Sequence, residues 1–209
     1  EIKAEKLSSN KIYLSKFEGA LKQSEIYTDP FYIVIDDNLL HFPQINLKIG
    51  YGNILLRGNF NDYDQYDFDA EISDVNLDYL YSIFGNNYPL KGNVEKGRFS
   101  INKMKSGNIQ SPIINLNVEI NTGFWDDISF DKLSLSTKFN NHRLEPFKLD
   151  VYTRLGFMRA NGWCNIGLPT DSVLFIPDDS LNFSIAFDKF DLLKVNKYFP
   201  WSFDTRGVL

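Results

Sequence analysis

Residues 52–94 read GNILLRGNFNDYDQYDFDAEISDVNLDYLYSIFGNNYPLKGNV, and the rest of the chain is organised around this segment. It contains an alternating strand, an acidic turn, a second alternating strand, a short helix and a Pro–Gly return, in that order. Much of it recurs later in the chain. Residues 156–162 match 52–58, and residues 183–187 match 68–72. A repeat with a period of about 100 residues predicts a fold built from stacked, similar units.

The composition is typical of a folded protein rich in strands. Of the 209 residues, 43% are hydrophobic and 15% are aromatic, and aromatic and β-branched residues favour pleated sheets. The net charge of −5 offers no basic stripe, so we expect no nucleic-acid partner. The single cysteine, Cys164, excludes an internal disulfide. No segment approaches the stretch of about 20 apolar residues that a membrane-spanning helix needs.

Most of the expected strands have one apolar face and one polar face. Residues 45–49 (INLKI) and residues 114–120 (INLNVEI) both alternate in this way. Short turns between successive strands predict antiparallel neighbours, and a one-sided pattern in such a sheet leaves one face dry. Since no linker or low-complexity tract interrupts the chain, we expect residues 1–209 to form one continuous segment. The two repeat copies would occupy roughly residues 40–94 and 144–209.

One helix is expected in the first half, over residues 75–84, where leucines and a phenylalanine recur at helical spacing. Asp74 is the expected N-cap, and Gly85 is the expected residue just past its end. A matching helix in the second copy would start near residues 188–191 and be stopped by Pro200. These short helices cannot cover the apolar face of so many strands.

Two architectures could bury such a face. Two sheets could pack together in a sandwich, or one long sheet could curl so that its apolar face lines a trough. The repeat favours an extended sheet. The sequence therefore predicts a mainly β protein: a long, curled antiparallel sheet, or taco-like groove, built from repeats with short helices.

The order of motifs resembles the AsmA-like superfamily, particularly its TamB-type members. The resemblance rests on GNILLRG, FDAEISDVNLDYL, PLKGNV and GRFSI, which follow one another here. The matching positions are residues 52–58, 75–80 and 90–94, and again residues 156–162, 190–195 and 206–208. Because the chain opens and stops within strand patterns, we expect it to be a piece of a longer repeat protein.

The resemblance implies a groove in the periplasm of a double-membraned bacterium, anchored to the inner membrane by a segment outside residues 1–209. Its implied role is to move phospholipids between the inner and outer membranes, to support outer-membrane protein assembly, or both. The implied partners are phospholipid acyl chains and, through regions outside this chain, an outer-membrane barrel protein.

The apolar side chains of the alternating strands carry this hypothesis. Their other possible role is ordinary core. The expected lipid-contacting residues of the groove are Ile45, Leu47, Ile49, Ile54, Leu56, Phe68, Ile72, Leu116, Val118, Leu133, Leu135, Leu149, Val151, Phe183, Ile185 and Phe187.

No catalytic constellation is evident, so we expect neither an enzyme nor a bound cofactor or metal. His41 and His142 lack cysteine or carboxylate neighbours at metal-ligand spacing. Cys164 is expected to be a small, buried hydrophobic residue. The acidic run 62–69 could collect calcium, but it lacks the glycine and closing glutamate of an EF-hand loop. A solvated turn leading into a polar strand face explains it better.

A different class of function stays open at this point. The chain could be a structural or interaction module, such as an adhesin-like β-sandwich or an assembly scaffold, with no lipid conduction. Such a module would bind strands at its open edge. The two hypotheses differ in shape, because the first requires an open, curved slab and the second a compact double layer.

Overall fold

The computed structural model describes residues 2–8, 10–21, 24–36, 39–61, 65–84, 89–103, 112–141, 143–154, 156–165 and 181–189. Its strands are β1 (Ile2–Ser8), β2 (Lys11–Leu21), β3 (Ser24–Thr28), β4 (Phe31–Asp36), β5 (Leu39–Ile49), β6 (Gly52–Asn61), β7 (Gln65–Asn76), β8 (Leu90–Lys103), β9 (Ile113–Trp125), β10 (Ile128–Asn140), β11 (Arg143–Tyr152), β12 (Phe157–Asn165) and β13 (Leu181–Asp188). The described helix is α1 (Leu77–Phe84).

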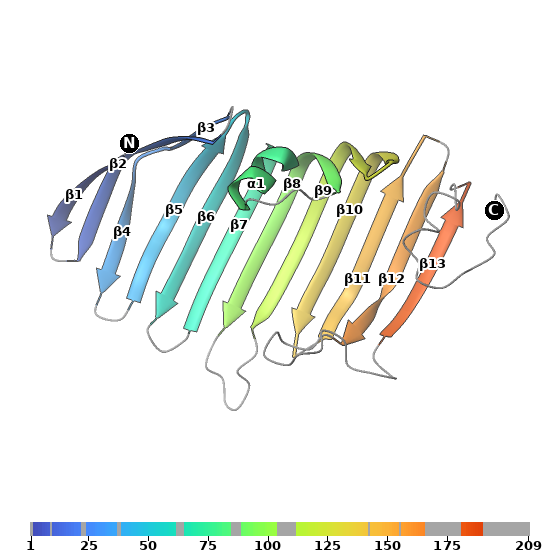
Figure 1. Cartoon of the computed structure of the whole chain (residues 1–209). Helices are drawn as coiled ribbons and strands as arrows, with labels where there is room; N and C mark the ends of the chain where they lie inside the picture. The colour runs from blue at the N-terminus through green and yellow to red at the C-terminus, as the bar shows by residue number, and fades with distance from the viewer. Residues whose placement is uncertain are drawn as a thin grey trace.

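All the strands belong to one 13-stranded antiparallel sheet, which follows the chain order from β1 to β13 (Figure 1). β3 and β4 share one position, because each pairs with a different part of β2 and of β5. The described strands do not form two sheets packed face to face, so the sandwich is not the fold observed. The expectation of a mainly β fold with one long antiparallel sheet is confirmed.

Helix α1 forms close to where the sequence predicts it, but its cap is different. The backbone N–H of Asp78 donates to Oδ1 of Asn76 at 2.8 Å, so Asn76 caps the first turn and the prediction of Asp74 is wrong. Asp74 has a φ of 55°, although the register between β7 and β8 is the same on either side of it. Aspartate tolerates this left-handed conformation better than most residues, and Asp74 therefore lies within β7, ahead of the helix.

The buried core lies on the face of the sheet that carries α1. Val75, Val94 and Leu133 are 0%, 2% and 4% exposed, and Leu77 packs from the helix against Val94 and its neighbours. A second cluster forms around Ile49, Ile54 and Val75. The helix is eight residues long, so it covers only one end of the strands.

Helix α1 contacts β2 as well as β7 and β8. In the sheet, β3, β5 and β6 lie between β2 and β7. Those four strand spacings would cover about 19 Å in a flat sheet, whereas a helix of this length extends about 12 Å. The contact between α1 and β2 is therefore expected if the sheet curls toward the helix and brings β2 closer to it. In agreement with this, β2 is visibly bent in Figure 1.

The two sequence copies occupy matching places in the sheet. Gly58 on β6 lies between Phe42 and Phe68 in the cross-strand register. Gly162 on β12 lies in the same way between Phe147 and Phe183. The expected second helix, the Gly85 position and the motif matches beyond residue 189 lie outside the described residues.

No helix among the described residues is long and apolar enough to cross a membrane.

Candidate functional site

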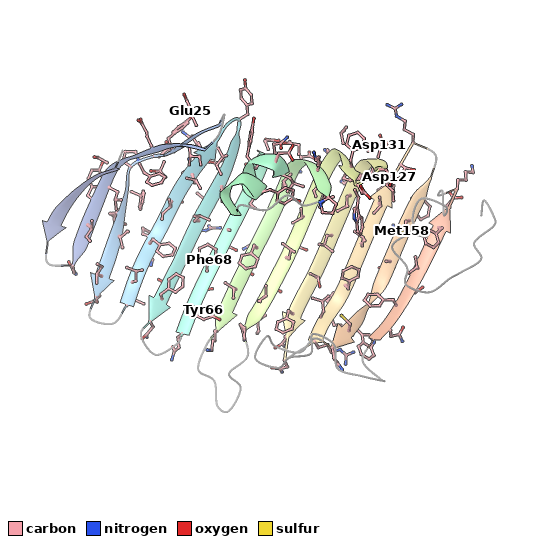
Figure 2. The ribbon with its side chains drawn as sticks, in the orientation of Figure 1. Glu25, Tyr66, Phe68, Asp127, Asp131 and Met158 are labelled. Atoms are coloured by element: carbon pink, nitrogen blue, oxygen red, sulfur yellow. The ribbon has the colours of Figure 1, made fainter. Side chains whose placement is uncertain are left out.

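The cross-strand register places all the expected groove residues on one face of the sheet, which we call the apolar face. Directly paired residues in an antiparallel sheet point to the same side. One such row runs through Leu47, Ile54, Ile72, Gly97, Val118, Leu135, Leu149, Ala160 and Ile185. Figure 2 shows Phe68 and Tyr66 on this sheet, toward the end of the strands away from α1.

Part of the apolar face is core. Ile49, Ile54, Leu133 and Val151 are all buried, at 8% exposure or less, and belong to the two buried clusters. For these four residues the structure shows the ordinary core role. Leu47, Leu56, Ile72, Val118, Leu135, Leu149 and Phe187 form the border of these clusters, where they are partly buried.

The remaining apolar face, further from α1, is what we call the open zone. From the sequence set it contains Ile45, Phe68, Leu116, Phe183 and Ile185, none of which belongs to either cluster. Phe183 and Ile185 are 37% and 42% exposed. The other three are partly exposed. No described helix or second sheet lies over these residues.

The open zone also contains aromatic residues that the sequence prediction missed. The ring of Phe42 lies 5.7 Å from that of Phe60 and 6.3 Å from that of Phe68, between centroids. Phe68 continues the contact to Phe99 at 6.3 Å, and Phe60 meets Tyr66 at 6.2 Å. Phe42 and Phe60 stand next to Pro43 and the acidic run, where the sequence indicates turns. The strands in fact extend past both.

The opposite face, which we call the polar face, is held together by ion pairs between neighbouring strands. The Asp69 carboxylate accepts from Nη2 of Arg57 at 2.8 Å and from Nε of Arg98 at 3.0 Å. Arg57 also bonds Glu71. The hydrogen bond to Asp69 is the main cause, and the nearby charge of Glu71 the next, of a raised pKa for the Arg57 guanidinium. The side chain of Asp69 is the most enclosed of the four.

Similar pairs link the later strands. Nζ of Lys132 lies 2.9 Å from Oε2 of Glu119, and this hydrogen bond raises the pKa of the lysine. Nε of Arg159 lies 2.6 Å from Oδ1 of Asp150, and that bond raises the pKa of the arginine. Every partner in these pairs is solvated to some degree, so the pairs fix strand register more than they add stability.

Two hollows lined by described residues lie on the polar face. The first has a volume of about 830 Å³ and extends from β5 to β9, over Arg57, Asp69 and Arg98. The second has a volume of about 350 Å³ and extends from β8 to β11. Arg98 and Asn117 line both. A twisted sheet is saddle-shaped, so one face can be concave along one diagonal while the other face is concave along the other.

The groups considered for chemistry have structural partners where they are described. Nδ1 of His41 contacts Oδ1 of Asn59 at 2.5 Å. Cys164 is buried on the apolar face, and burial raises the pKa of its thiol. Asp67 accepts from Asn102. Within the described part of the chain, no three His, Cys, Asp or Glu side chains gather to hold a metal ion. His142 and residues 62–64 lie outside it.

No family model, no curated protein and no solved structure matches this chain.

Proposed function

We propose that residues 1–209 form a groove segment of an AsmA-like, TamB-type envelope protein, and that the open zone binds phospholipid acyl chains. In this proposal the protein moves lipid between the inner and outer membranes, supports outer-membrane protein assembly, or does both, and carries out no chemical reaction. It works in the periplasm, with its membrane anchor outside this chain. The observation that carries the proposal is the uncovered apolar surface around Phe68, Phe99 and Leu116.

The extent of this surface supports a ligand rather than chance exposure. Apolar residues occupy matching positions on successive strands from β5 to β13, whereas soluble proteins rarely expose contiguous apolar patches of this kind without a binding role. Each CH2 group that leaves water contributes about 0.8 kcal/mol. An acyl chain lying across several strands would therefore gain several kcal/mol.

The chemistry of the surface supports movement of the ligand along it. The open zone is made of aliphatic and aromatic side chains in repeated rows, and hydrophobic attraction has no preferred direction. An acyl chain would meet a similar environment at Leu116 as at Ile45, so no single position would trap it. By contrast, the buried residues beneath α1 are already packed, so the ligand would lie in the half of the face away from the helix.

One observation, the exposed edge strand β13, supports the alternative that the chain is an interaction module. β13 carries Phe183 and Ile185 at 37% and 42% exposure, and it pairs with β12 alone among the described strands. An exposed strand edge with apolar side chains can pair with a strand from another protein. This mode would place a peptide at the edge, whereas lipid binding uses the middle of the apolar face.

Native mass spectrometry after incubation with phospholipid vesicles tests the proposal. The variant Leu116→Lys places a charge in the open zone, and Asn117→Lys places the same charge one residue along on the polar face. We expect co-purified or acquired phospholipid in the wild type and in Asn117→Lys, and its loss in Leu116→Lys. Circular dichroism confirms that both variants keep the sheet.

Two results would count against lipid binding. One is a wild-type protein that acquires no phospholipid while a known lipid carrier does so under the same conditions. The other is equal lipid occupancy in Leu116→Lys and Asn117→Lys. If instead a strand-forming peptide binds at the edge strand β13, beside Phe183 and Ile185, and no lipid is bound, the interaction-module alternative is supported.

A further inference from the structure

The two hollows on the polar face adjoin each other, because Arg98 and Asn117 line both, and we call them together the trough. Together they cross the sheet from β5 to β11. Six strand spacings correspond to about 29 Å, so the trough is long as well as open. It lies on the face opposite the proposed acyl-chain surface, and lipid binding uses none of its side chains.

The formal charges that line the trough balance. Its cationic side chains are Arg57, Lys96, Arg98 and Lys148. Its anionic side chains are Asp67, Asp69, Glu119 and Asp150. The whole chain, in contrast, carries a net charge of −5. The lining as a whole therefore carries no net charge that would favour an anion or a cation, and this balance is compatible with a neutral ligand.

Between the charges stand groups that both donate and accept hydrogen bonds. Asn115 donates to Ser100 at 3.1 Å, and Ser136 donates to Oδ1 of Asn117 at 2.7 Å. Each of these amides and hydroxyls keeps further hydrogen-bonding capacity. The side chain of Arg98 uses Nε for Asp69 and is 63% exposed, so its remaining N–H groups face the trough. Alternating donors and acceptors match the hydroxyl groups of a sugar, each of which donates one hydrogen bond and accepts others.

We propose that this trough binds a neutral, linear oligosaccharide, which lies across the strands with its hydroxyl groups between Arg98, Asn117 and the neighbouring carboxylates. The ion pairs hold the side chains in place before the ligand arrives. Arg57 and Arg98 fix both oxygens of Asp69, so little side-chain freedom is lost on binding. The volume of about 830 Å³ in the first hollow is within the range of small-ligand sites.

Isothermal titration calorimetry with maltohexaose, cellohexaose and chitohexaose tests the proposal on the intact chain. We expect saturable binding of at least one of them. Arg98→Ala and Asn117→Ala should each weaken it by about tenfold, the loss expected for one or two hydrogen bonds to a charged or amide group. The matched control is Asn161→Ala, which removes the same amide from the polar face of β12, beyond the trough. Its affinity should equal that of the wild type.

The competing outcomes are distinct. No saturable binding of any of the three sugars would overturn the proposal. So would an equal loss of affinity in Asn161→Ala and Asn117→Ala, or tighter binding of an acidic chain such as oligogalacturonate than of every neutral one. Lipid occupancy, measured in parallel, should be unchanged in Arg98→Ala, so that failure of the sugar site is separable from failure of the lipid groove.

Discussion

The ring of Phe147 meets the ring of Phe183 nearly edge-on, with centroids 5.4 Å apart and planes at 87°. Gly162 lies between them in the register. The first copy has the same arrangement, where Phe42 and Phe68 meet at 6.3 Å and 69° beside Gly58. In each copy the glycine provides the space in which two aromatic side chains from the strands on either side come into contact.

This arrangement predicts that an added methyl group is costly at Gly162 and less so at Gly58. A Cβ at Gly162 would lie 2.1 Å from the backbone oxygen of Asn182, whereas a Cβ at Gly58 would lie 2.9 Å from the ring of Phe42 and 3.0 Å from the backbone oxygen of Asp67, a much milder overlap. A ring can move more readily than a paired strand. We expect Gly162→Ala to lower the free energy of unfolding by about 1–3 kcal/mol and Gly58→Ala to lower it less, in urea denaturation.

Gly19 on β2 supplies the matched control for that comparison. A Cβ there would meet no atom within 4 Å, so Gly19→Ala should leave the stability unchanged or raise it slightly by restricting the unfolded chain. Equal losses at all three glycines would contradict the role assigned to the Phe–Gly–Phe contact.

The division of the apolar face predicts different costs for two leucines on one strand. Leu133 is 4% exposed and belongs to the larger buried cluster, whereas Leu135 stands at its border. Truncation of a fully buried leucine costs about 2–5 kcal/mol. Leu133→Ala should therefore reach that range in thermal or urea unfolding, and Leu135→Ala should cost clearly less. If the two substitutions lower the free energy of unfolding equally, Leu135 is as well packed as Leu133 and belongs to the core.

Asp29 should titrate at unusually low pH. Its carboxylate accepts from Nζ of Lys48 at 2.9 Å and from Asn46, and these bonds hold its pKa below the ordinary value of 3.8. A lowered pKa contributes stability that is present above 3.8 and is lost as the pH falls through the folded-state pKa. In an NMR titration, Lys48→Met should bring the pKa of Asp29 back up toward 3.8. Lys132→Met, on a distant pair, should leave it unchanged.

The rate at which the Cys164 thiol is alkylated measures how readily the sheet opens around it. The thiol is buried and its pKa is raised by that burial, so the reactive thiolate is scarce in the folded protein. We expect slow reaction with iodoacetamide in buffer and fast reaction in urea. Rapid alkylation of the folded protein would show that β11 and β12 open readily around this residue.

Alternation within single strands was enough to predict the fold class. The INLNVEI pattern of residues 114–120 indicates a strand with Leu116 on the apolar face and Asn117 on the polar face, and the structure has this arrangement. The face shared by the groove residues follows from the same period of two. Both features depend only on residues that are close together in the sequence. They can therefore be predicted from a single sequence.

What the sequence did not show depends on register and on backbone exceptions. The contact of Arg98 with Asp69 joins β8 to β7, and no local pattern says which residue will stand opposite which. The polar trough was missed for this reason. The helix cap was misplaced because Asp74 and Asn76 are both acceptable capping residues. The hydrogen bond from the backbone N–H of Asp78 to Asn76 distinguishes them. The packing that buries Leu133 and leaves Leu116 partly exposed is a tertiary property.

Photocrosslinking in cells tests the central claim most directly. A benzoylphenylalanine replaces Phe68, in the open zone shown in Figure 2, and a second variant carries it at Asp67, the preceding residue on the polar face. Irradiation followed by mass spectrometry should give phospholipid adducts at position 68 and none at position 67. Adducts at neither position, while a known lipid carrier labels normally, or equal adducts at both, would contradict an apolar face that receives acyl chains.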